Sequence, residues 1–346
     1  MRFYDIFLAQ SLCDLVGIRY NQCINTEGKV RQMTAKGAPT SRKGRGLARK
    51  CWSQRAFFLM LLPGALYYII YRYIPVVAGV VVSLKKYNVK RGIWGSPWAS
   101  PLTTNFRFYF SSPYFWPLLR NTLIISMSKL LLGLPLAVLL AVLLNECRSR
   151  RLRRVVQTLT YMPHFLSWVV IYGMCFVLFS ETNGLVNDWL RTLTGHTVPF
   201  FSNAQTFRGL VIGSDLWKTT GWNAIIYLAA ISGIDPSLYE AAYMDGATRG
   251  QTIRHITLPC IANVVVMTLI LRCGSVLDAG FDQIYVMYNE GVYSTVDIID
   301  TWVYRMGFEK FNIPLSSAVG LFKSVVSLAM VVTVNAISKR WGESMW

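Results

Sequence analysis

The sequence contains few charged residues and fewer acidic ones. Only 15% of its 346 residues are Asp, Glu, Lys or Arg, whereas 53% are hydrophobic. This composition excludes an ordinary water-soluble domain, in which about a quarter of the residues are charged. Acidic residues number 17 against 35 Lys and Arg, so the net charge is +18.

A basic excess of this size is compatible with nucleic-acid binding, but its distribution is not. Lys and Arg gather before and between apolar runs instead of covering one soluble domain. Retention of basic loops on the cytoplasmic side of a membrane explains that distribution better. We therefore expect a lipid bilayer, and not nucleic acid, as a partner.

Residue patterns typical of catalysis and of metal binding are lacking. The seven Cys lie far apart without a Cys-x-x-Cys pair, and the three His are scattered, which argues against a disulfide framework or a metal cluster. No Gly-x-x-x-x-Gly-Lys-Ser/Thr loop, Ser/His/Asp set or pair of catalytic carboxylates is found. We predict that the chain is not an enzyme and has no catalytic residue, metal or cofactor of its own.

What the sequence does contain is long hydrophobic runs. Each is near or above the roughly 20 residues that cross a hydrocarbon core as a helix, the conformation that satisfies backbone groups in lipid. We expect Pro63, Pro75, Pro135 and Pro163 to kink or delimit these helices. The prediction is an all-α membrane protein with six transmembrane helices, at residues 57–84, 121–145, 156–180, 207–232, 259–280 and 314–338.

The distribution of Lys and Arg predicts the orientation. The basic residues at 42–55 and 148–154 are expected in the cytoplasm, which places residues 235–259 and both termini there as well. Residues 1–56 are predicted to be a basic cytoplasmic tail, with Met33 as a possible natural start, and residues 57–346 the membrane domain. Basic residues within 85–91 contradict the rule, because they would lie outside.

The predicted outer segments, residues 85–120, 181–206 and 281–313, are rich in aromatic residues. An aromatic belt at the membrane interface is the preferred interpretation. Stacking on a sugar, or contact with a binding protein, is the alternative.

Charged residues inside membrane spans are costly and usually functional. Asp215, Lys218 and Trp222 are spaced to share one helical face. An ion pair between helices explains such charges as well as a substrate contact does. The charged candidates are Arg72, Lys129, Asp215, Lys218, Arg272, Asp278 and Lys323.

The stretch at 235–259 has the signals of a short helix, a turn and a second short helix at the membrane surface. Asp235 and Pro236 form a helix start, because Asp accepts a bond from a free N–H and Pro suits the first turn. Gly246 permits a sharp turn, and Pro259 can open the next helix.

This stretch resembles the cytoplasmic EAA loop of ABC-importer permeases. In that family the loop is a coupling helix that docks in a cleft of the ATPase subunit. The resemblance implies that Glu240 meets a basic group of the ATPase and that Gly246 shapes the turn. The matching residues are Glu240, Ala241, Ala242, Gly246, Ile256, Leu258 and Pro259.

The resemblance extends over about residues 57–346. It is to the oligosaccharide and polysaccharide branch, often labelled lipoprotein-type, which includes the alginate-oligosaccharide importer permease of Gram-negative bacteria. The residues that carry it are 62–64, 121–126, 161–168, 280–284 and 341–346. They imply a type I ABC-importer permease fold, with both termini cytoplasmic, in the bacterial inner membrane.

The resemblance also implies partners and a mechanism. A solute-binding protein outside the cell would deliver an oligosaccharide to a cavity between this chain and a second, homologous permease. Two ATPase subunits, which bind ATP and Mg, would drive alternating access. The cargo path implied is lined by Asp215, Lys218, Thr219, Trp222, Arg272, Val276 and Ala279.

The cargo and the class of protein each leave alternatives. A basic pair at Lys218 and Arg272 would suit an anionic cargo such as alginate fragments, because both groups pair with carboxylates. An ABC permease for another small solute remains a rival, as do a membrane enzyme, a channel and a non-transporting membrane subunit. Co-purification with an ATPase would separate the last of these from a permease.

Overall fold

The structure, a computed structural model, describes residues 55–339. Within that range the regular elements are helices, together with one isolated β-bridge between Lys85 and Trp98. The described chain forms two units, divided between Pro75 and Val76. Most of the predicted tail and the motif at 341–346 lie outside the described residues.

The first unit consists of α4 (Arg55–Tyr68) and the π-helical turn η1 (Ile69–Tyr73), from which the chain continues into α5 (Ile74–Ser83). Pro63 lies inside α4, and Arg72 lies in η1 just ahead of Pro75. Proline cannot donate to the preceding turn, and a wider π turn is one way to accommodate it. The 25 residues of Leu59–Ser83 are long and apolar enough to cross a membrane.

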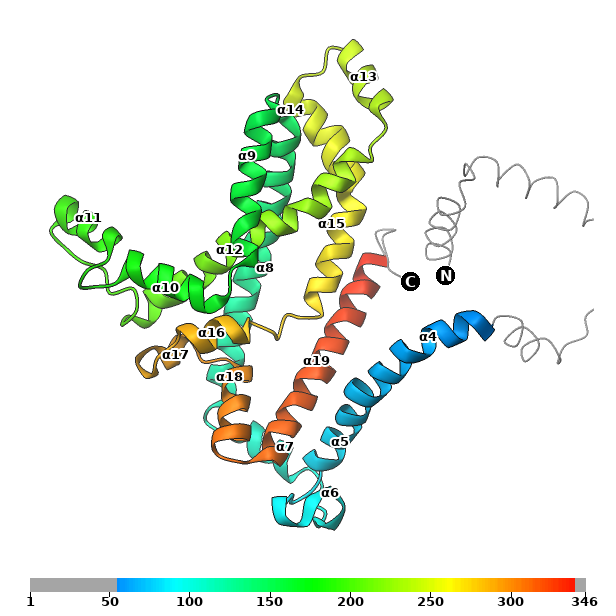
Figure 1. The fold of residues 1–346 in the computed structure, drawn as a ribbon, viewed down its shortest axis with the longest axis vertical. Helices are drawn as coiled ribbons and strands as arrows, with labels where there is room; N and C mark the ends of the chain where they lie inside the picture. The colour runs from blue at the N-terminus through cyan, green and yellow to red at the C-terminus, as the bar shows by residue number, and fades with distance from the viewer. Residues whose placement is uncertain (1–54, 340–346) are drawn as a thin grey trace, which may run out of the picture. The chain divides into compact units, whose positions relative to one another are not determined.

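The second unit is built around two long helices, α8 (Phe115–Glu146) and α12 (Ala204–Ser232), which pack along each other (Figure 1). A small residue, Gly133, lies where α8 meets Leu216 of α12, and another allows α12 to approach α9 (Arg150–Tyr161). A side chain at Gly221 would collide with the carbonyl oxygen of Thr160, so the glycine brings α12 directly onto α9.

The run predicted as one helix at 156–180 is broken. After α9 come the 3-10 turn η3 (Met162–Phe165) and α10 (Trp168–Phe179), and the two halves are bent by 109°. Pro163 lies in the break, as its restricted backbone predicts. The helix α11 (Leu185–Thr194) follows.

The run predicted at 259–280 also differs from the structure. The helical stretch Arg249–Cys273 comprises α14 (Arg249–Thr252), the π turn η4 (Ile253–Thr257) and α15 (Leu258–Cys273). The helix ends at Cys273, seven residues before the end of the predicted run. The helix α19 (Ile313–Lys339) packs against α15. A Cβ at Gly274 would lie 2.8 Å from Val331 of α19, so this glycine permits the close approach.

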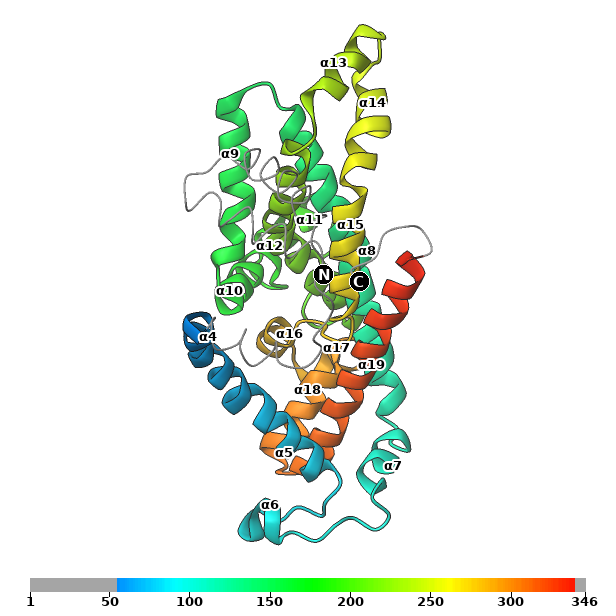
Figure 2. The same cartoon turned by 90° about the vertical axis from the view of Figure 1, so that its right-hand side faces the viewer.

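Short helices fill two of the predicted outer segments. The first contains η2 (Val89–Arg91), α6 (Gly92–Gly95) and α7 (Thr104–Phe110). The other contains α16 (Phe281–Met287), η5 (Glu290–Val292), α17 (Tyr293–Val296), α18 (Ile299–Tyr304) and η6 (Arg305–Glu309). In Figures 1 and 2 α6 and α7 lie at one end of the second unit, and α13 (Pro236–Met244) and α14 lie at the other.

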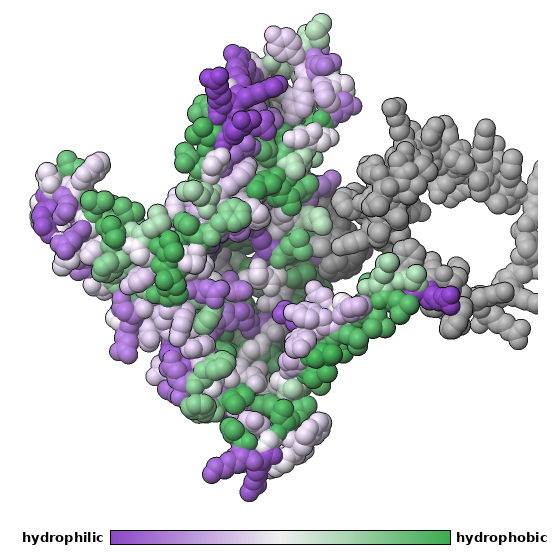
Figure 3. Space-filling model, in the orientation of Figure 1, coloured by the Kyte–Doolittle hydropathy of each residue, from purple (hydrophilic) through white to green (hydrophobic). Residues whose placement is uncertain are grey.

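Among the described residues four helices are long and apolar enough to span a membrane, or five if the bent α9–α10 pair is one span. The helix α12 is 29 residues long but is not one of them, and it carries Arg208, Asp215 and Lys218. Figure 3 shows hydrophilic side chains gathered at the end where α9 starts, and hydrophobic ones beyond it along the unit. Exposed arginines at positions 148, 150, 151 and 154 lie at that end.

Candidate functional site

The segment predicted to couple to an ATPase begins with a capped helix. Asp235 is the N-cap of α13, and one of its carboxylate oxygens accepts the backbone N–H of Ser237 at 2.9 Å. That hydrogen bond lowers the pKa of Asp235, so the cap stays charged at neutral pH. Pro236 occupies the first helical turn. The predicted helix start is confirmed.

Gly246 ends α13 in a left-handed turn. Its φ is +75°, which residues with a Cβ adopt at a cost. The N–H of Gly246 bonds to the carbonyl of Tyr243, and that of Ala247 bonds to the carbonyl of Ala242, at 3.1 and 2.9 Å. These two bonds are the Schellman motif, which satisfies the last carbonyls of a helix.

The chain then turns into α14, where Thr248 and Gln251 form a capping box. Pro259 lies in the first turn of α15, as expected from the sequence, although the helical stretch continues without a gap from Arg249. The π turn η4 lies directly before Pro259, where a regular turn would press the proline ring against the preceding carbonyl.

Between the end of α13 and α14 lies a surface hollow of about 310 Å³. Glu240 and Ala241 are exposed on α13, and Tyr243 and Met244 are 81% and 85% exposed at its end. Of the predicted coupling residues, the hollow is lined by Ala242, Gly246 and Ile256, with Asp245, Ala247, Gln251, Thr252 and His255 beside them.

A second hollow, of about 320 Å³, is partly open to the surface of the helix bundle, because Ser275 and Asp278 at its wall are exposed. We call it the cavity. The charged groups at its wall come from α8, α12 and α15, and from the non-helical segment 274–280. Four of the seven residues predicted for a cargo path line it. The lining residues are Ser126, Lys129, Leu130, Asp215, Arg272, Ser275, Val276, Asp278, Ala279 and Gly280.

An ion pair crosses this cavity between α8 and α12. Lys129 Nζ lies 3.2 Å from Asp215 Oδ1, and the two side chains are only 12% and 18% exposed. Lys129 also donates to the carbonyl of Ala279 at 2.9 Å and to Gln283 Oε1 at 2.6 Å. The interhelical ion pair that the sequence left open is therefore present.

Glycine makes room for this ammonium group. Gly280 has a φ of +92°, and a Cβ there would lie 2.9 Å from Lys129 Nζ. Gln283 is fully buried, and its amide nitrogen donates to the carbonyl of Val211 and to Ser214 Oγ. Lys129 is thus fixed by groups from three segments, α12, α16 and the non-helical segment.

Arg272 is the less constrained cation of the cavity. Its guanidinium makes no hydrogen bond or ion pair with the described part of the chain. It points toward α8, where a Cβ on Gly133 would lie 3.9 Å from its nitrogen. Asp278 also lines the cavity, so anionic and cationic groups both face the space.

Three predicted path residues lie elsewhere. Lys218 donates to the carbonyl of Leu166 and lies 4.9 Å from the ring of Trp168, so it does not form a pair with Arg272 at the cavity. Thr219 bonds back to the carbonyl of Asp215. Trp222 stacks on His164 with centroids 4.4 Å apart. Lys218 and Trp222 face the broken third run, because the turn at η3 brings the chain back against α12.

Residues missing from the predicted path include Ser126, Gln283 and Gly280. Lys129 and Asp278 had a detectable signal, because both are charges inside apolar runs. Gln283 and Gly280 had none beyond their place in the motif at 280–284. The buried partners of Lys129 come from segments separated by about 150 residues, and spacing along one helix does not reveal such contacts.

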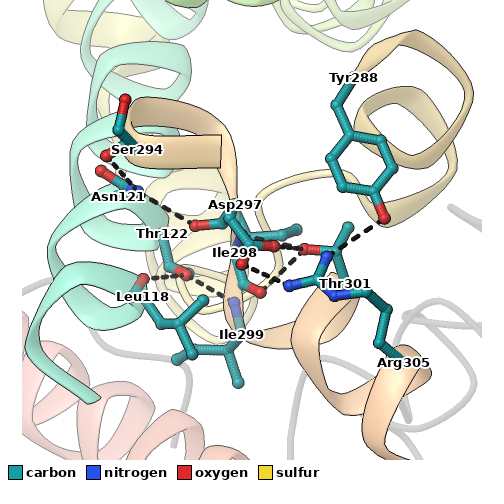
Figure 4. Close-up of polar contacts among 10 residues, drawn as sticks. All are labelled: Leu118, Asn121, Thr122, Tyr288, Ser294, Asp297, Ile298, Ile299, Thr301 and Arg305. Atoms are coloured by element: carbon teal, nitrogen blue, oxygen red, sulfur yellow. Dashed lines mark hydrogen bonds and ion pairs between the residues drawn. The ribbon is translucent and has the colours of Figure 1, made fainter. Parts of the chain in front are cut away.

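A polar network holds the outer short helices against α8 (Figure 4). Asn121 donates to the carbonyls of Ser294 and Asp297, both at 3.2 Å. Thr122 Oγ1 accepts the N–H of Ile299 at 3.1 Å. The motif at 121–126 therefore has a structural role.

Arg305 closes the same network. It donates to Asp297 at 2.5 Å and to the hydroxyl of Tyr288 at 3.2 Å, and it lies 4.6 Å from the ring of Tyr293. Burial acts to lower the pKa of Arg305, but the hydrogen bond and charge of Asp297 outweigh it, so the pKa is raised. Arg305 therefore stays charged, and the segment between α16 and η6 is rigidly held.

Comparison with protein families gives one match that covers more than half of the chain. Residues 133–343 match the model of the binding-protein-dependent transport system inner membrane component. The matched region includes both the coupling segment and most of the cavity.

Several known proteins are similar over most of their length. Protein LplB of Bacillus subtilis (strain 168) is 40% identical over 308 residues, covering 88% of this chain and 96% of LplB. The polygalacturonan/rhamnogalacturonan transport system permease protein YteP of the same organism is 40% identical over 301 residues, covering 87% and 93%.

Solved structures agree with these relatives. One is the crystal structure of a bacterial ABC transporter involved in the import of the acidic polysaccharide alginate. Its chain is 36% identical, with a TM-score of 0.78 over 85% of this chain and 98% of that one. A second shows the bacterial alginate transporter in complex with an alginate pentasaccharide-bound periplasmic protein, at 35% identity and a TM-score of 0.79.

Proposed function

The chain belongs to the family of binding-protein-dependent transport system inner membrane components, and from that premise we propose that it forms the membrane path for an oligosaccharide. It is a permease subunit of an ABC importer, with the all-helical type I permease fold. The observation that supports this cargo path is the cavity lined by Lys129, Asp215 and Arg272.

In this proposal six segments cross the membrane and both termini are cytoplasmic. Four of these segments are the long apolar helices. The bent α9–α10 pair is the fifth, and the charged helix α12 is the sixth. The arginine-rich start of α9 and the helix α13 lie at the same end of the second unit (Figures 1 and 2). Because basic loops are retained in the cytoplasm, this arrangement supports a common cytoplasmic face.

The coupling contact would be made by α13 and the turn at Gly246. Exposed Glu240 would meet a basic group of the ATPase, and the apolar side chains of Tyr243 and Met244 would enter its cleft. ATP and Mg would bind to two ATPase subunits, which are separate chains. Their closure would move α13 and, through the continuous helix from Arg249, the wall of the cavity.

An anionic oligosaccharide is the cargo that the cavity supports best. Arg272 lacks a partner among the described residues, whereas the charge of Lys129 is already matched by Asp215. A guanidinium group that faces a cavity can pair with a carboxylate through two parallel bonds. The relatives that act on polygalacturonan and alginate carry acidic sugars, which is consistent with this proposal.

The transport cycle would follow alternating access. A binding protein outside the cell delivers the oligosaccharide to a cavity shared with a second, homologous permease. ATP binding closes the ATPase pair and opens the cavity outward, and hydrolysis returns it to the inward state. Arg272 would hold the sugar carboxylate while Lys129 and Asp215 keep α8 and α12 together.

The test is the ATPase activity of the complete importer in lipid, with binding protein loaded with either uronate or neutral oligosaccharides. Stimulation by uronates, reduced roughly tenfold or more by Arg272→Gln, supports the proposal. Equal stimulation by neutral sugars would keep the importer and discard the anionic cargo. Failure to assemble with any ATPase would discard the coupling assignment.

A further inference from the structure

A row of four aromatic rings lies directly after the cavity in the chain. Phe281 and Tyr285 are one turn apart on α16, and Tyr304 and Phe308 are one turn apart at the end of α18 and in η6. The centroids of Phe281 and Tyr285 are 5.3 Å apart, those of Tyr285 and Tyr304 are 4.8 Å apart, and those of Tyr304 and Phe308 are 5.1 Å apart. We call these residues the aromatic row.

The aromatic row is a surface and not part of the hydrophobic core. Tyr285 is 39% exposed and Phe308 is 71% exposed. On α16 the buried residues are Gln283, Ile284 and Met287, which lie on the other side of the helix. The two stacked pairs have planes only 21° and 30° apart, an offset arrangement that leaves part of each ring free.

The neighbours of the aromatic row indicate contact with water instead of lipid. Asp282, Glu309 and Lys310 are all exposed beside it. Two of its four members are tyrosines, which carry a polar hydroxyl on an apolar ring. Charged groups of both signs are costly at a hydrocarbon surface, so a lipid-facing role does not fit.

The aromatic row is held in place before any ligand arrives. Gln283 ties α16 to α12 through two hydrogen bonds, and Arg305 ties the end of α18 to Asp297. Because the rings are already fixed, a ligand that stacks on them loses little additional conformational entropy of the protein.

We propose that the aromatic row is an outer subsite that stacks on the sugar rings of the oligosaccharide before they reach the cavity. Sugar rings present flat arrays of C–H groups to aromatic faces, and their hydroxyls bond to tyrosine. The spacing of successive ring centroids is comparable to the length of one sugar unit. Gly280 lines the cavity and Phe281 is the next residue in the chain, so the aromatic row begins beside the cavity wall. This inference rests on the proposed oligosaccharide function.

The experiment compares uptake by the complete importer in proteoliposomes, with a saturating supply of loaded binding protein. The probes are uronate oligosaccharides from disaccharide to hexasaccharide. We expect Tyr285→Ala and Phe308→Ala each to lower the uptake rate of the longer oligosaccharides roughly fivefold to tenfold, and Tyr285→Trp to retain it. The matched control is Trp189→Ala, which removes an aromatic side chain that is 76% exposed on α11 and should leave uptake unchanged.

Each outcome decides a separate question. If the wild-type importer takes up none of these oligosaccharides, both the proposed function and the subsite fail. If the wild type transports them and both alanine variants transport them equally fast, the subsite alone is overturned. If the alanine variants no longer co-purify with the second permease, the aromatic row is a subunit contact and the sugar assignment is also overturned.

Discussion

At the scale of single residues, the ion pair between Lys129 and Asp215 makes the stability of the protein sensitive to the loss of either side chain. Two largely buried charges contribute little net stability as a pair, but removing one partner leaves the other unpaired at a cost of about 3–5 kcal/mol. The remaining acceptors of Lys129, Ala279 and Gln283, are neutral and replace only part of that interaction.

We therefore expect Asp215→Leu to lower the midpoint of thermal unfolding of the purified complex by several degrees. The double variant Lys129→Met with Asp215→Leu should recover most of the loss, because no unpaired charge remains. Thermal unfolding of the two variants and the wild type in nanodiscs measures this directly. A double variant no more stable than the single one would show that the ion pair is not the source of the effect.

At the scale of one element, the turn after α13 depends on backbone conformation alone. Within residues 55–339, and apart from the adjoining residues, no heavy atom lies within 4 Å of a Cβ built on Gly246, so a side chain there meets no steric obstacle from that part of the chain. Its φ of +75° is the remaining constraint. Gly246→Val should therefore disturb the turn and abolish sugar-stimulated ATP hydrolysis, whereas Gly246→Asn should retain much of it, because Asn tolerates this conformation.

The measurement for Gly246 is ATPase stimulation in proteoliposomes, with the amount of assembled complex determined in parallel. Equal activity of the Val and Asn variants would show that the left-handed turn is not needed for coupling. Loss of the permease from the membrane in the Val variant alone would instead point to a folding defect, which the assembly measurement would reveal.

The charge of Glu240 gives a second test of the same element. Glu240 is exposed on α13, so its reversal should not disturb the fold of the helix. We expect Glu240→Lys to abolish uptake by repelling a basic group of the ATPase, and Glu240→Gln to weaken it less, since an amide still accepts a hydrogen bond. Pull-down of the ATPase by each variant reports the contact; normal uptake by Glu240→Lys would remove Glu240 from the interface.

The local structure of the segment 235–259 was predictable from the sequence, and the cavity only in part. Asp235, Pro236 and Gly246 act on the backbone within a few residues of their own positions, so their signals are local and the structure agrees with them. The cavity depends on where α15 ends, and the close approach of α19 at Gly274 is not visible in a continuous apolar run. The structure does not bring Lys218 to the cavity beside Arg272, because the 109° bend places the carbonyl of Leu166 next to Lys218.

At the scale of the whole molecule, the basic residues within 85–91 contradict the predicted topology, because they would lie outside. The contacts of Lys85 explain part of this disagreement. Lys85 is only 4% exposed, donates to the carbonyl of Ile93 at 2.8 Å and lies 4.7 Å from the ring of Trp98. A lysine bound in this way is a structural part of its segment and not a free surface charge. Lys85 therefore does not weigh against the predicted topology as a free charge would, whereas Lys86, Lys90 and Arg91 are exposed and still contradict the positive-inside rule.

The last prediction concerns the sidedness of the segments. We expect cysteines introduced by Ser149→Cys and Ser237→Cys, in a background without the native cysteines, to react with an impermeant maleimide only after the membrane is opened. Trp94→Cys and Trp189→Cys, at positions 90% and 76% exposed in the predicted outer segments, should react in intact cells. The two pairs test the same topology from opposite sides, because six crossings with both ends inside place α9 and α13 with the ATPase. Labelling of Ser237→Cys from outside would contradict the coupling assignment as well as the topology, since ATP is available only in the cytoplasm.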